Sequence, residues 1–127
     1  MCESIGEAEA VEGLKAEAAA LKAAAETLVD TTATALACAD LNAGLANATL
    51  YLDAFGHVVV AWLWLEQALA ATRASGGMSD QAFYAGKLAA CRYFFRYELP
   101  KAHVQLALVC ALDQTCLDLA PEHFTGA

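Results

Sequence analysis

The chain has 127 residues, of which 59% are hydrophobic, and its 15 acidic and 7 basic side chains give a net charge of −8. A chain of this length normally forms one domain with its own core, so we expect residues 1–127 to be a single domain. Alanine and leucine dominate and there are only 2 prolines, which predicts an all-α fold. The acid surplus argues against nucleic acid and against an anionic membrane surface as partners, because both require an excess of lysine and arginine.

Neither the first residues nor the cysteines are typical of an exported protein. The first residues, MCESIGEAEA, are acidic rather than basic and then apolar, so they do not resemble a secretory signal. The longest uninterrupted apolar run, residues 58–65, is far shorter than the about 20 residues that cross a membrane. The 5 cysteines lack metal-binding spacing and are expected to be reduced thiols. We therefore expect a cytoplasmic protein without a membrane segment.

A first helix is predicted over residues 7–39. Apolar side chains, including Leu14, Leu21 and Leu28, recur at steps of three and four residues, and charged side chains occupy the opposite side.

A second helix is predicted over residues 43–74. Its central part, YLDAFGHVVVAWLWLE at 51–66, is apolar nearly all round, which is typical of a helix with several neighbours. Gly56 in a helix interior costs about 1 kcal/mol relative to Ala, so we expect a neighbouring helix to pass close to the backbone there.

The sequence SGGMS at 75–79 predicts a turn, with Ser79 as the N-cap of a third helix over residues 80–99. A last segment, 101–119, continues the helical pattern. Pro100 lies between the two and should kink the helix or split it, because proline cannot donate the helical hydrogen bond. The expected architecture is an antiparallel up-down bundle of three long helices, counted as four if the last one is split at Pro100.

Asp53 and His57 lie four residues apart and share a helix face, where they could form a catalytic pair or two metal ligands. No third residue in the sequence completes either site. A hydrogen bond at a helix cap or between helices is the more common role for such a histidine, and we assign no catalytic and no metal-binding residue.

Arg92 and Arg96 are also four residues apart and repel each other, so the sequence predicts carboxylate partners on another helix, with Asp53 and Glu66 as candidates. The alternative is an anion site for a phosphate or a CoA group. Arginines among aromatic side chains are typical of interface centres. We therefore predict that another subunit or domain covers one face of residues 80–99, and the candidate interface residues are Arg92, Tyr93, Phe94, Arg96, Trp62 and Trp64.

Two stretches resemble a known family. They are NATLYL at 47–52 followed by Phe55, Gly56 and both tryptophans, and FYAGKL at 83–88 followed by ACRYFF at 90–95 and ELP at 98–100. Both are similar to the extra C-terminal domain of long bacterial acyl-CoA dehydrogenases, a subgroup that includes 3-methylmercaptopropionyl-CoA dehydrogenase. The similarity spans about residues 8–119. Many members carry arginine where this chain has Asp53.

The resemblance implies a flavoenzyme that oxidises the α,β bond of an acyl-CoA. A glutamate removes the α-proton, and FAD accepts the hydride. The upstream domain that supplies the FAD site and the glutamate does not occur in these 127 residues, so no cofactor-binding residue is assigned. The implied role is packing against the acyl-CoA dehydrogenase catalytic core, in cis or in trans, together with homo-oligomer formation. The alternative is a free-standing helical oligomerisation or interaction protein.

Overall fold

The computed structural model describes residues 1–74 and 77–125, and within them all regular structure is helical. This confirms the all-α prediction. The elements are α1 (Cys2–Glu9), a 3-10 turn η1 (Glu12–Leu14), α2 (Lys15–Ala37), α3 (Leu41–Leu45), α4 (Ala48–Arg73), α5 (Met78–Tyr93), a π-helical segment (Phe94–Glu98), α6 (Leu99–Cys110) and α7 (Glu122–Thr125).

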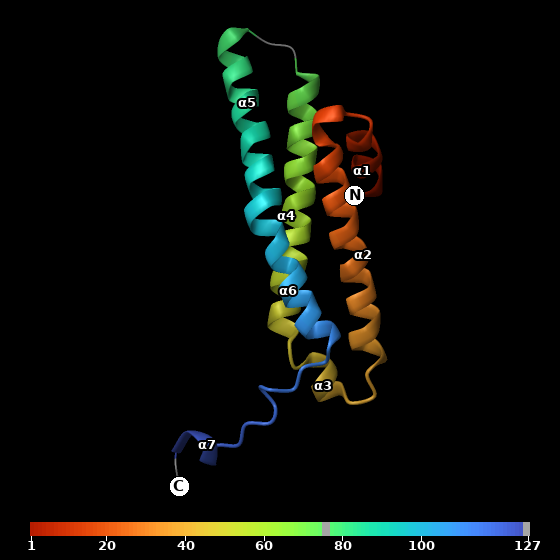
Figure 1. Cartoon of the computed structure of the whole chain (residues 1–127), viewed down its shortest axis with the longest axis vertical. Helices are drawn as coiled ribbons and strands as arrows, with labels where there is room; N and C mark the ends of the chain where they lie inside the picture. The colour runs from red at the N-terminus through yellow and green to blue at the C-terminus, as the bar shows by residue number, and fades with distance from the viewer. Residues whose placement is uncertain (75–76, 126–127) are drawn as a thin grey trace.

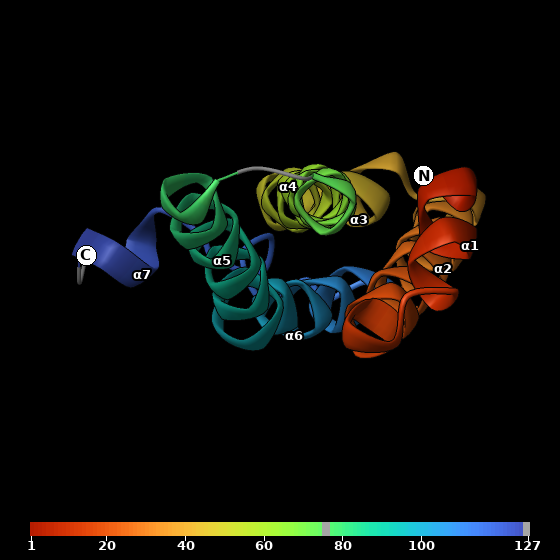
Figure 2. The same ribbon diagram turned by 90° about the horizontal axis from the view of Figure 1, so that it is seen from above.

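Three long rods form the bundle (Figure 1). The first is α2, the second is α4, and the third is α5 running through the π segment into α6. The second rod is antiparallel to the other two, and α1 packs against α2 and α4 (Figures 1 and 2). The short α7 lies away from the rods.

The core lies where α2, α4 and α6 meet, and α4 and α6 make the most extensive helix–helix contact. Its largest fully buried side chains include Leu21 of α2, Leu65 of α4 and Leu106 of α6. Alanines such as Ala61 and Ala102 are also fully buried among them. Small side chains let the backbones approach closely, so leucine from one helix fills the space beside alanine of the next.

The first predicted helix is two helices. The chain turns at residues 10–14, where Val11 is extended and η1 follows, so α1 folds back along α2. The apolar pattern continues across this turn, because Leu14 at the end of η1 is buried in the core directly before α2 begins.

The second predicted helix begins later than expected, since α3 ends at Leu45 and α4 starts at Ala48. The expected close approach at Gly56 is wrong, because a Cβ placed there would meet no atom within 4 Å. The close approach is at Gly44 instead, where a Cβ would lie 2.8 Å from the carbonyl oxygen of Ala35.

The third rod continues through Pro100, which occupies the first turn of α6. The π segment precedes it, and the amide of Leu99 donates to the carbonyl of Phe94, five residues earlier. A π turn is wider than an α turn. Pro100 follows it, and its nitrogen carries no hydrogen, so it cannot donate a helical hydrogen bond. The predicted helix over 101–119 is too long, since α6 ends at Cys110 and Leu112 takes a φ of 51°, the left-handed conformation that ends helices.

The predicted turn at 75–79 lies partly at residues 75–76, outside the described residues. α5 begins at Met78 with Gly77 as its N-cap, so the prediction of Ser79 as the N-cap is wrong.

α4 is the one helix in the described ranges whose length and composition would allow it to cross a membrane, with a mean hydropathy of 1.4 over its most apolar window. A central bundle helix meets the same criterion, and α4 contacts α1, α2, α5 and α6. Only 22% of that window is buried, so much of its apolar surface faces outward. The exposed side chains there include Leu52, Phe55, Val60 and Leu63.

Candidate functional site

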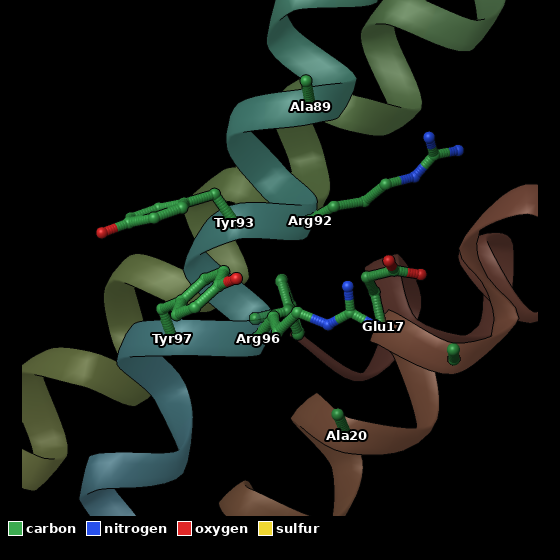
Figure 3. A pocket seen from close by; sticks show the side chains of 9 residues that line it. Glu17, Ala20, Ala89, Arg92, Tyr93, Arg96 and Tyr97 are labelled. Carbon is green, nitrogen blue, oxygen red and sulfur yellow. The ribbon is translucent and has the colours of Figure 1, made fainter.

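A groove of about 510 Å³ runs between α2 and the third rod, and we call it the α2–α5 groove. Its α2 wall is Ala16, Glu17 and Ala20, and its other wall is Ala89, Arg92, Tyr93, Phe95, Arg96 and Tyr97. The groove exists because α5 packs mainly on α4, whereas α6, further along the same rod, packs on both α2 and α4. Figure 3 shows its two walls facing each other.

The two arginines of the groove are exposed, and both extend from the same side of the rod towards α2 (Figure 3). Within residues 1–74 and 77–125, none of the ion pairs includes either of them. The guanidinium of Arg96 points towards Glu17, the carboxylate on the opposite wall. The groove therefore carries two positive charges on one wall and one negative charge on the other.

The predicted carboxylate partners of the arginines are bonded elsewhere, so that prediction is wrong. The carboxylate of Asp53 accepts a hydrogen bond from the side-chain amide of Gln105. Glu66 accepts one from the hydroxyl of Ser4, at 2.9 Å. The sequence places both acids on α4 but does not show that α1 and α6 supply their partners.

Tyr93 and Tyr97 form a stacked pair at the edge of the groove, with ring centroids 4.8 Å apart and an interplanar angle of 25°. Their side chains remain 57% and 58% exposed, so the stack projects rather than filling the core. Exposed stacked rings beside arginines are the side chains that dominate binding energy at interface centres.

The other predicted interface residues do not join this surface. Phe94 is half-buried on a different side of the rod, with its ring centroid 6.2 Å from that of His57. Trp62 is half-buried and donates to Ser4 of α1 at 2.9 Å. Trp64 is half-buried under the ammonium group of Lys87. The predicted set thus divides into one exposed surface, made by Arg92, Tyr93 and Arg96, and three separate packing contacts.

Two groove residues were missing from the predicted set. Tyr97 could have been included, because it follows Tyr93 by four residues. Glu17 gives no such signal, since only the packing of α2 against the third rod brings it opposite the arginines.

Cys91 is buried beside the groove, and burial raises the pKa of its thiol from 9.0 to about 12. The negative charge of Glu17 raises this pKa further, and the positive charge of Arg92 partly offsets it. The thiol therefore stays protonated and unreactive near neutral pH, and it acts as a small core side chain.

Asp53 and His57 line a second groove of about 470 Å³, but they do not form a catalytic pair. Nδ1 of His57 donates to the backbone carbonyl of Asp53 at 2.9 Å, not to its carboxylate. Nε2 of His57 lies 3.9 Å from the carboxylate of Glu98, which also binds Lys101 at 2.6 Å. Among the residues described, no group of three or more His, Cys, Asp and Glu side chains is placed to hold a metal ion.

These observations define a class of protein: an all-helical module with an open groove lined by arginines and stacked tyrosines. The model of the acetyl-CoA dehydrogenase C-terminal-like family matches residues 1–120. The chain therefore belongs to this family, as the resemblance in its NATLYL and FYAGKL stretches implied. Comparisons with curated proteins and with solved structures found no match.

Proposed function

We propose that the chain is the C-terminal helical module of an acyl-CoA dehydrogenase-like flavoenzyme, where it packs against the catalytic core and supports subunit association. The observation that carries the proposal is the family match over residues 1–120. The outward apolar surface of α4 and the α2–α5 groove supply surfaces for such contacts. The module binds and positions, and it performs no chemical step of its own.

The described residues do not fit FAD. A flavin dinucleotide needs several donors converging on its pyrophosphate, and the α2–α5 groove instead places the carboxylate of Glu17 opposite its two arginines. In this proposal the catalytic core holds FAD and the base that removes the α-proton, and the full enzyme oxidises an acyl-CoA thioester. The reduced thiols suit a cytoplasmic location, which is part of the same proposal.

The test is binding to a flavin-loaded acyl-CoA dehydrogenase core that lacks this domain, taken from the same genome. We expect a stable complex by size-exclusion chromatography with flavin absorbance in the same peak, and a higher melting temperature of the core. Failure of the two proteins to co-elute, with both folded, would contradict the proposal.

A free-standing helical interaction protein is the second candidate. The outward apolar surface of α4 favours it, because such a surface calls for a partner without requiring a flavoenzyme. In that case the chain would self-associate in the same way whether or not the catalytic core is present, and the co-elution experiment distinguishes the two.

A further inference from the structure

We propose that the α2–α5 groove is a self-complementary docking surface, occupied by the same groove of a second copy of this chain in a two-fold dimer. This inference rests on the subunit association in the proposed function and assigns it to named residues. In a two-fold interface each contact occurs twice, so a surface can pair with itself only if it carries complementary features on its two sides.

The charges of the groove meet this requirement. Arg92 and Arg96 stand on one wall and Glu17 on the other. A two-fold axis through the groove brings the arginines of each copy opposite the partner's Glu17, and one carboxylate can accept hydrogen bonds from two guanidinium groups. Three other cations of the described residues are paired with acids: Lys15 with Glu12, Arg73 with Glu7 and Lys101 with Glu98. Neither groove arginine takes part in an ion pair of the described residues, so a carboxylate from a second copy could bind them.

The shapes of the two walls are also complementary. Ala16, Ala20 and Ala89 leave space along the groove, whereas Tyr93 and Tyr97 project at its edge as a stacked pair. The two-fold arrangement lets the tyrosines of each copy cover the alanines of the other, which places large rings against small side chains as in well-packed interface centres.

Other occupants match the groove less well. A phosphate group would face the negative charge of Glu17, and the arginines lie on an open surface without buried donors to support it. An acidic segment of the catalytic core would satisfy the arginines but would leave Glu17 among like charges. The second copy satisfies both walls.

The experiment uses two charge reversals, Arg96→Glu and Glu17→Arg, and measures self-association by sedimentation equilibrium. We expect the wild-type chain to dimerise, and either variant alone to raise the dimer dissociation constant about tenfold or more, because each repulsive pair occurs twice. Mixing the two variants in equal amounts should restore a dimer. In that pairing the glutamate introduced at position 96 faces the arginine introduced at position 17, and the native Arg96 faces the native Glu17.

The heterodimer is the decisive result, because a role of these residues within one chain could not produce it. Arg73→Glu is the matched control: it reverses an exposed cation on α4 and should leave the dimer intact. Circular dichroism must show that all variants remain helical. The inference would be overturned if the wild type is monomeric at high concentration, or if neither charge reversal changes the dimer dissociation constant.

The core-binding experiment is separate from this one. If the wild type is monomeric and Arg96→Glu instead weakens binding to the flavin-loaded core, the groove serves the core and the dimer inference is wrong while the proposed function stands. If the dimer and its heterodimer form but no core binds, the proposed function is wrong and the dimer inference stands.

Discussion

α5 and α6 follow one another along a single rod, yet they meet the bundle differently. α6 packs against α2 and α4 and buries Leu99, Ala102, Leu106 and Val109. α5 packs mainly against α4, and among its described side chains Cys91 is the buried one. The difference indicates that α6 stabilises the fold, whereas α5 keeps large aromatic and charged side chains at the surface, where they are available for binding.

The alkylation rates of two cysteines, Cys91 and Cys116, test whether α5 is firmly packed despite its small buried surface. Because burial raises the pKa of the Cys91 thiol to about 12, only about one Cys91 in 1000 is a thiolate at pH 9, whereas Cys116 is exposed to solvent. We expect Cys91 to be alkylated more than about 100-fold more slowly than Cys116, because its thiol is both buried and protonated, and its reactivity to rise only as the pH approaches 12. Mass spectrometry of iodoacetamide-treated protein measures both rates. Equal rates would mean that α5 detaches from the bundle readily.

A core deletion in α6 should have the largest effect on stability. Leu106 is fully buried, so Leu106→Ala removes apolar contacts and leaves a cavity, and we expect a loss of about 2 to 5 kcal/mol in the free energy of unfolding. Leu108→Ala on the same helix is the control, because that side chain is 43% exposed. Urea unfolding followed by circular dichroism gives both values. A similar loss of unfolding free energy for the two variants would mean that the buried face of α6 contributes no more to stability than its exposed face.

Gly44 and Gly56 allow the contrast between closely packed and open regions to be tested at the backbone. Gly44→Ala places a Cβ 2.8 Å from the carbonyl oxygen of Ala35, a backbone atom that cannot easily move, and we expect a loss of about 1 to 2 kcal/mol. Gly56→Ala meets open space within a long helix, so the better helix propensity of alanine should stabilise the fold by about 0.5 to 1 kcal/mol. Thermal unfolding of the two variants should shift in opposite directions, and a loss at Gly56 would show that the surface there is closed.

The smallest effect on stability is expected at the groove. Tyr93→Ala removes a stacked but exposed ring, and we expect a loss below about 1 kcal/mol. Chemical unfolding at a concentration where the chain is monomeric measures it. A loss as large as that of Leu106→Ala would mean that α5 stabilises the fold as α6 does.

The sequence was sufficient for the fold class and for the rods, because the spacing of leucine and alanine marks one buried face on each helix. It was not sufficient for the break at residues 10–14, since the apolar period continues through Leu14 while the chain reverses direction. The end of α6 was also missed, because Leu117 and Leu119 extend the apolar pattern although both are exposed. Periodicity identifies residues that share a face, but it does not show whether another helix lies against that face.

The same reason limits what the sequence shows about the candidate site. The arginines and Tyr93 were predicted as interface residues because arginines lie among aromatic side chains there, and the structure places all three at the surface. Their relation to Glu17 depends on how α2 lies against the third rod, and the assignment of Glu66 to the arginines was wrong because α1 folds back and supplies Ser4. The tryptophans were also among the predicted interface residues, and each has its own partner within the bundle.

The two tryptophans allow the packing of the bundle to be followed by intrinsic fluorescence. They are two residues apart on α4, so their indoles face different neighbours. Trp62 is hydrogen-bonded to α1, and Trp64 lies beneath Lys87 of α5. They are the 2 tryptophans of the chain, so Trp64→Phe leaves an emission signal that follows the docking of α1, and Trp62→Phe leaves one that follows the docking of α5.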